Sequence, residues 1–280
     1  MKTLRLAVLL MLAIAPVSAQ RWTHAQLVKI LSDNKGAVDL LKRVDSAYGK
    51  PVDAGLVKNL GRDAVAAVEQ GTPIIRFDSA RPVSQELVVR ELCRLQLFAE
   101  GWPSIQVHDR SGGSLQRRAQ FFLDNIWDEL QNRQIYPRMR AIGFDPYAQA
   151  RTRIKDFLSR PSSAVPVNVE GFTVTYMHVA LMDDAALKAK MVAWVRDRQQ
   201  YAWGKAEDLD WALTVGGDIA DAIEHIKVPG PSALPDASVD VLLRASALLN
   251  HGKPVFVIES WKPDYFKNGR KLRLGVIPSA

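Results

Sequence analysis

The sequence predicts an α+β protein in which helices dominate. Several long segments repeat apolar residues every three to four positions, which is the spacing of one face of an α-helix. Two short runs, Ile74–Phe77 and Val255–Ile258, are instead almost continuously apolar and rich in β-branched and aromatic residues, as buried strands are. Hydrophobic residues make up 48% of the 280 residues, so the chain can bury a sizeable core.

The N-terminal elements follow from these patterns in order. The helical spacing over Thr23–Tyr48 breaks near Ser32–Asn34, which predicts two short helices. A weak helix or turn is expected over Val52–Gln70, and a short strand at Ile74–Phe77 follows it. The most regular segment of the chain, Ser84–Glu100, predicts a long amphipathic helix.

The second half of the chain alternates helices with extended segments. A helix is expected over Leu115–Gln134, after a loop containing Ser111–Gly113, and Pro137 should end or kink it. Two prolines and two serines in residues 161–166 indicate a linker, and Val167–Leu181 reads as an extended run. Further helices are predicted over Ala185–Gln200, Asp218–Ile226 and Ser238–Asn250, and Asn268–Gly269 predicts a hairpin turn before a strand at Leu272–Ile277.

The first residues have the order of a cleavable signal peptide. Lys2 and Arg5 precede an apolar run over Leu6–Ala15, and Val17–Ala19 provides a small-residue exit. The alternative is a membrane anchor, but the run is well short of the roughly 20 residues that span a bilayer. We therefore expect residues 1–19 to be removed and the protein to be exported to the periplasm or the extracellular space. No stable membrane span is expected after cleavage.

Charge and cysteine content limit the function classes. The chain has 37 basic and 30 acidic residues, and removal of residues 1–19 leaves 35 basic residues and a net charge of +5. This mild excess favours an unknown protein or peptide partner of acidic character. No basic run alternates with aromatic residues, so a nucleic-acid partner is not expected. Cys93 is the only cysteine, which excludes an intramolecular disulfide, and its place beside the apolar line of its helix predicts burial.

One helix carries the pattern with the most chemical information. A short strand leads through an acidic turn into Arg90–Glu91–Leu92–Cys93–Arg94, and Gly101 follows the helix. This arrangement resembles the active-site helix of the zincin metallopeptidases, whose HExxH motif holds zinc with two histidines and activates water with the glutamate. The resemblance covers about Ile74–Pro146. Together with the linker at 161–166, it implies a zincin-like lobe over residues 20–160 and a second, mixed lobe over 161–280.

In this sequence the chemistry of the motif is removed. Glu91 keeps the glutamate position, but Arg90 and Arg94 occupy both histidine positions, and a guanidinium has no lone pair for zinc. The later helix, which supplies a third ligand in such enzymes, offers Asn125, Asp128 and Glu129 but no histidine. The resemblance thus implies a degenerate cleft at Arg90, Glu91, Arg94, Asn125 and Asp128, without metal or cofactor, in which the arginines could hold an anion.

Two other interpretations of this region remain. The helix could be an ordinary amphipathic helix whose charged residues form a solvated face, with Glu86 and Arg90 as a favourable pair four residues apart. The chain could also be an active envelope hydrolase whose site the sequence does not reveal. The expectation we carry forward is a non-catalytic binding or scaffolding protein of the cell envelope.

The remaining motifs carry little chemistry. The five histidines show no metal-ligand spacing, and no GxSxG elbow is present. The segment Val215–Asp218 lacks the lysine and the glycine spacing of a phosphate-binding loop, so Asp218 is expected to cap a helix.

Overall fold

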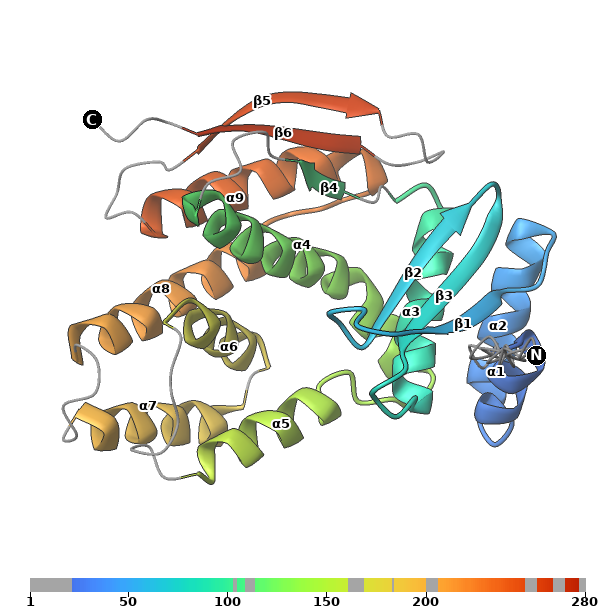
Figure 1. Ribbon diagram of the computed structural model, residues 1–280, viewed down its shortest axis with the longest axis horizontal. Coiled ribbons are helices and arrows are strands. Elements are labelled where there is room, and N and C mark those ends of the chain that lie inside the picture. Colours follow the sequence, from blue (N-terminus) through green and yellow to red (C-terminus); the bar gives the residue numbers. More distant parts are fainter. Residues whose placement is uncertain are drawn as a thin grey trace, which may run out of the picture.

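The computed structural model describes residues 22–102, 105–108, 114–160, 169–182, 184–199, 206–249, 256–263 and 270–276. The described residues form an α+β fold, with helices over most of their length and two small sheets at separate places (Figure 1). The predicted signal peptide, the linker at 161–166, the loop at Ser111–Gly113 and the turn at Asn268–Gly269 lie outside the described residues. None of the described helices is both long and apolar enough to cross a membrane.

The N-terminal part builds one sheet with helices packed against it. Its elements are α1 (His24–Leu31), α2 (Lys35–Tyr48), β1 (Asp53–Val57), β2 (Ala64–Glu69), β3 (Thr72–Asp78) and α3 (Gln85–Ala99). The strand order is β1-β3-β2, with β1 parallel and β2 antiparallel to the central strand β3. Helices α1, α2 and α3 all contact this sheet.

One face of this sheet enters the larger hydrophobic core. Ile75 and Phe77 of β3 are fully buried, and the register places Ala54 and Ala66 opposite Ile75. Because side chains alternate along a strand, Arg76 lies on the other face, where it forms an ion pair with Asp53. The helices therefore cover one face of the sheet, and the pair of Arg76 and Asp53 lies on the opposite face.

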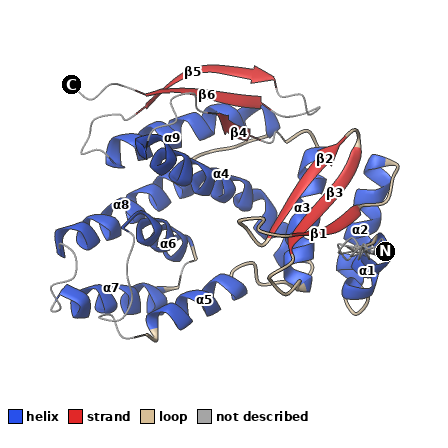
Figure 2. Cartoon of the chain, in the orientation of Figure 1, coloured by secondary structure: helices blue, strands red, loops and turns tan. Residues whose placement is uncertain are grey.

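The remaining elements form a helical part and a second sheet. They are β4 (Ile105–His108), α4 (Ser114–Ala141), α5 (Ala148–Leu158), α6 (Val169–Leu181), α7 (Ala185–Gln199), α8 (Ala206–His225), a 3-10 turn (Pro231–Ala233), α9 (Leu234–Leu249), β5 (Phe256–Pro263) and β6 (Arg270–Val276). The second sheet has the order β4-β6-β5, so a strand of the first half pairs with the C-terminal hairpin (Figure 2). Helix α4 runs from this sheet to α3.

Two hydrophobic cores hold these elements together. The larger core takes side chains from α1 to α4 and also from α6, α8 and α9, which lie beyond the predicted boundary after residue 160. The smaller core joins α5, α6, α7 and α8 around Trp194, whose ring lies 5.0 Å from that of Phe157 and 5.9 Å from that of Phe172. The division of the chain into two domains stays a prediction.

The contact between α6 and α8 depends on a glycine. A Cβ atom added to Gly216 would lie 2.7 Å from the backbone oxygen of Thr173, which is closer than real Cβ atoms approach. The neighbouring Gly217 has room, because its added Cβ would be 3.8 Å from the Tyr176 ring. The segment Val215–Asp218 therefore serves close helix packing inside α8, and the expectation that Asp218 caps a helix is wrong.

Two sequence-based assignments are wrong for identifiable reasons. Residues 53–57 and 64–69 are strands and not a weak helix, because their alanines and valines pair with β3 and bury one face. The predicted extended run at Val167–Leu181 is helix α6 over its described part. The hydroxyls of Thr173 and Thr175 donate to the carbonyls four residues earlier, which satisfies these β-branched residues within a helix.

Pro137 neither ends nor divides α4, which continues to Ala141. A proline in a helix removes one backbone hydrogen bond and usually disfavours the helix. Here Ile135 and Met139, on either side, are fully buried in the larger core. Arg138 also forms a two-pronged ion pair with Glu100, with both distances 2.7 Å. Tertiary contacts on both sides of the proline thus outweigh its local cost.

Candidate functional site

Helix α3 carries the Arg90–Arg94 segment into the larger core. The helix starts at Ser84, whose hydroxyl accepts a hydrogen bond from the Leu87 amide at 3.2 Å. Leu92, Cys93 and Leu95 are fully buried in the core. These apolar contacts on the following positions hold the helix in the core, and Glu91, directly before them, is buried as well.

Glu91 is fully buried and is shared between two arginines. Its Oε1 accepts a hydrogen bond from Arg90 Nε at 3.1 Å, and its Oε2 accepts one from Arg94 Nη1 at 2.9 Å. The side chain of Arg94 is only 10% exposed, whereas that of Arg90 is 30% exposed. Both carboxylate oxygens of Glu91 are therefore engaged by cations on its own helix.

The electrostatics of this group favour the ionised carboxylate. Burial alone would raise the pKa of Glu91, but the charges of Arg94 and Arg90 outweigh burial and hold it below its ordinary value. The Nε of Arg94 is buried and has no hydrogen-bond partner among the described residues. The arrangement is an ion-paired centre that holds negative charge at Glu91.

Helix α4 extends this centre towards solvent. Asp128 lies 3.9 Å from Arg94 Nη2 and 3.7 Å from Nη1 of Arg62, which precedes β2. The charges thus form a chain from Glu91 through Arg94 and Asp128 to Arg62. Asn125, one turn earlier on α4, donates to the carbonyl of Phe121 on its own helix at 2.7 Å.

The structure thus brings four of the five predicted site residues together. Arg90, Glu91, Arg94 and Asp128 form one ion-paired cluster, whereas the side chain of Asn125 is engaged within its own helix. The alternative of a solvated charged face is wrong for Glu91 and Arg94, which are buried. Only Arg90, with nearly a third of its side chain exposed, fits that alternative in part.

A second buried carboxylate lies on the same helix as Asp128. Glu129 is 7% exposed, lies 3.3 Å from Nε2 of His178 on α6, and accepts a hydrogen bond from Asn132 at 3.1 Å. Burial raises the pKa of Glu129, and His178 and Asn132 oppose this shift without cancelling it. Glu129 is therefore a group that favours the protonated form more than an ordinary glutamate does.

Neighbouring polar groups strengthen this character. The pKa of Tyr136 is raised well above its ordinary value, chiefly by burial and further by the charge of Glu129. The side-chain oxygen of Asn132 is buried without a hydrogen-bond partner among the described residues. A buried acid with a raised pKa beside such polar groups is a common feature of functional sites.

Sequence reasoning weighed Glu129 as a third-ligand position but did not predict its pairing with His178. The two residues are separated by 49 positions in the printed sequence, and α6 was expected to be extended. An extended segment gives no basis for placing His178 against α4. Neither Arg62 nor its pairing with Asp128 carried any signal in the sequence.

The donor set at the centre does not suit a cation. Guanidiniums occupy the two positions that hold zinc in the zincin motif, and their charge opposes a divalent ion at Glu91. Within the described ranges, no three histidine, cysteine, aspartate or glutamate side chains gather in a way that could hold a metal ion. What the cluster can do chemically is neutralise a buried charge and present arginine donors at its edge.

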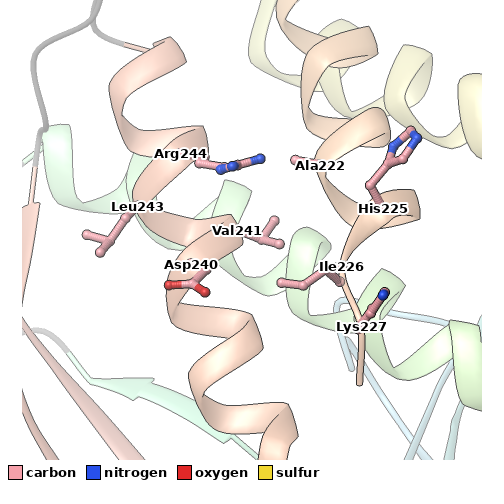
Figure 3. Close-up of a pocket in the computed structure, with 8 residues that line it drawn as sticks. All are labelled: Ala222, His225, Ile226, Lys227, Asp240, Val241, Leu243 and Arg244. Carbon is pink, nitrogen blue, oxygen red and sulfur yellow. The ribbon is translucent and has the colours of Figure 1, made fainter. Parts of the chain in front are cut away.

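Two hollows lie outside this centre. One, of about 650 Å³, is a groove between the end of α8 and α9, where Arg244 extends towards Ala222 above Val241 and Ile226 (Figure 3). Its charged side chains, Asp240 and Arg244 among them, are exposed. The other, of about 800 Å³, is a cleft at the first turns of α3 and α5.

Comparisons with protein-family models, with curated proteins and with solved structures found no match.

Proposed function

We propose that this chain is a non-catalytic, zincin-like protein of the cell envelope that binds or scaffolds a partner. The observation that carries the proposal is the complete engagement of Glu91 by Arg90 and Arg94 in a buried position. A general base needs a free lone pair and a pKa near the working pH. Both carboxylate oxygens of Glu91 already accept a hydrogen bond from an arginine and its pKa is lowered, so it does not fit the role of the catalytic glutamate.

The binding role follows from the charges at the edge of the centre. Arg62, Arg90 and Arg94 face two carboxylates, Glu91 and Asp128, which leaves one positive charge in excess. Arg90 and Arg62 are the partly exposed cations, at 30% and 47%. An acidic protein or peptide segment would complement this edge by charge-assisted hydrogen bonds.

Export is the part of the proposal that rests on residues 1–19. The expected mature protein begins at Gln20 and is found in the periplasm or the medium. N-terminal sequencing of the protein purified from fractionated cells measures this directly. A protein that keeps Met1 and stays in the cytosolic fraction would contradict the export proposal.

A competing function is supported by the buried acid Glu129. Its raised pKa and its contact with His178 are features of groups that transfer protons, so an active hydrolase would use this pair and not Glu91. Purified mature protein should show neither stoichiometric zinc nor chelator-sensitive hydrolysis of peptides and esters. Zinc at one equivalent, lost on chelation together with hydrolysis, would overturn the non-catalytic proposal.

The zincin-like origin of the centre has its own test. The double variant R90H/R94H places two histidines one turn apart on α3, beside Glu91, Asp128 and Glu129. We expect it to bind zinc at least about tenfold more tightly than the matched variant R90Q/R94Q in calorimetry. Circular dichroism of both variants checks that α3 is still folded. Equal zinc affinity of the two folded variants would count against the origin.

A further inference from the structure

The cleft at the first turns of α3 and α5 is built around a buried aspartate. Asp63, just before β2, is 9% exposed. It contacts Arg81 from the loop after β3 and Arg153 from α5, the latter at 2.5 Å. Burial would raise the pKa of Asp63, but the hydrogen bonds and charges of Arg153 and Arg81 together lower it. Three segments far apart in sequence thus converge on one carboxylate.

This arrangement positions two guanidiniums at the wall of the cleft. Arg81 donates to Asp63 through its Nη1 atom, and Arg153 donates to Asp63 through its Nη2 atom. Each arginine therefore uses one terminal nitrogen. Each side chain is about half exposed, at 45% and 57%. A guanidinium carries five N–H donors in a planar fork, so donors remain on both arginines for a ligand in the cleft.

The acceptors of the cleft are already in use. The carboxylate of Glu86, on α3, is hydrogen-bonded by the backbone amide of Gln149 at the start of α5. The side chain of Gln149 donates to Ser84 Oγ at 3.2 Å. These bonds tie α5 to α3 and leave arginine donors as the groups that still seek partners. A matching ligand must therefore supply acceptors.

The rest of the lining sets the character of the ligand. Pro82, Leu87 and Ala148 give the cleft an apolar side, and its volume of about 800 Å³ accommodates a small organic molecule. Arg81 and Arg153 carry two positive charges, and Asp63 and Glu86, which also lines the cleft, carry two negative charges when both are ionised. The lining then has no net charge, which suits a monoanion better than a dianion, and the planar fork of arginine matches a carboxylate.

We propose that the cleft between α3 and α5 binds a small organic carboxylate with an apolar body, and that Arg81 and Arg153 hold its carboxylate. Asp63 is a positioning residue, since its carboxylate contacts both guanidiniums and orients them in the wall of the cleft. The site shares no residue with the Glu91 centre, so it stands or fails independently of the proposed non-catalytic function.

The experiment uses N-acetyl-leucine as the probe, with N-acetyl-leucinamide as its neutral match and inorganic phosphate as a second anion. Binding is followed by chemical-shift changes in protein NMR spectra at ligand concentrations up to about 10 mM. We expect saturable binding of the carboxylate, with shifts at residues of α3 and α5. The amide and phosphate should bind at least about tenfold more weakly.

Variants assign the binding to the two arginines. R81Q and R153Q should each weaken binding at least about tenfold, whereas R76Q, which removes an arginine paired with Asp53 on the far face of the sheet, should not change it. R153K keeps the charge and guards against loss of folding; it should weaken binding by a smaller factor. Equal binding of acid and amide, equal binding of phosphate, unchanged affinity in R81Q and R153Q, or no binding of the probe would each overturn the proposal.

Discussion

Two glutamates on adjacent helices are buried to a similar degree, and their pKa values are shifted in opposite directions. Glu91 on α3 and Glu129 on α4 are 0% and 7% exposed. Two arginines contact Glu91, whereas a histidine and an amide contact Glu129. The pKa of Glu91 is lowered and that of Glu129 is raised. Burial sets the same cost for both, so the permanent charge of the neighbours decides the outcome.

The difference has a functional consequence. A carboxylate held between arginines is fixed in one protonation state and is a structural group at every physiological pH. A carboxyl group with a raised pKa favours the protonated form more than an ordinary glutamate does. Glu91, which matches the glutamate of the zincin motif in the sequence, therefore keeps its charge, and the acid with the raised pKa lies on the next helix.

The largest expected effect comes from removing the charge of Glu91. E91Q removes the hydrogen-bonded counter-ion of buried Arg94 and leaves only Asp128 at 3.9 Å, and breaking such a buried pair costs about 3–5 kcal/mol of unfolding free energy. Urea denaturation at neutral pH measures this loss. The matched variant E100Q removes the partner of Arg138 at the surface, where the expected loss is at most about 1 kcal/mol. Similar losses in the two variants would show that the Glu91 pairs are not a buried centre.

A smaller loss of stability is expected when the contact between α8 and α6, the helix that carries His178, is disturbed. G216A introduces a methyl group against the Thr173 carbonyl of α6, and overpacking of this kind costs about 1–3 kcal/mol. G217A has room and should stabilise α8 by up to about 1 kcal/mol through helix propensity. Thermal or urea unfolding of both variants tests the contact, and a stable G216A would place α6 further from α8.

Glu91 and Glu129 should change the free energy of unfolding in opposite directions as the pH rises. The lowered pKa of Glu91 gives stability that is present above the unfolded value, near 4.3, and lost as the pH falls through the folded value. The raised pKa of Glu129 gives stability that is present below the unfolded value and lost as the pH rises through the folded value. E129Q should therefore gain stability relative to the native protein between pH 4 and 7, by about 1 kcal/mol or less. Denaturation curves across this range would contradict the assignment if the relative gain ran the other way.

The last prediction concerns the chemical reactivity of the Cys93 thiol. Cys93 is fully buried, and burial raises its pKa to about 12 in spite of Arg138 and Arg43. A thiol-specific reagent at pH 8 should label the folded protein at least about a hundredfold more slowly than the urea-unfolded protein. Rapid labelling of the folded chain would show that the α3 core admits solvent and that the Glu91 centre is less dry than the contacts indicate.

The sequence predicts most of this fold where local signals and tertiary contacts agree. The two helices within Thr23–Tyr48 and α3 follow from apolar periodicity, and β3 follows from its continuous apolar run. The structure confirms these elements and the α+β class. The Ser84 cap and the apolar line of α3 act within a few residues, so one sequence is enough to place them. The predicted helix therefore also gave the correct relative positions of Arg90, Glu91 and Arg94, which all lie within α3.

The failures occur where distant contacts decide. Alanine-rich β2 becomes a strand because β3 pairs with it, and α6 becomes a helix because its threonine hydroxyls bond within it and Gly216 lets α8 approach. The Glu129–His178 contact depends on α6 and could not be predicted once that segment was expected to be extended. The convergence of Arg81 and Arg153 on Asp63 likewise joins three separate segments and has no local signature.

Carboxyl-selective ¹³C NMR titration of the glutamate side chains tests the central comparison most directly. The signals of Glu91 and Glu129 are assigned by their loss in E91Q and E129Q, and their shifts are followed from pH 2 to pH 8. We predict that Glu91 titrates below the ordinary glutamate range and Glu129 above it. A Glu91 signal that titrates at or above the ordinary value would contradict this prediction, because the two arginines would then not hold the carboxylate in its ionised form.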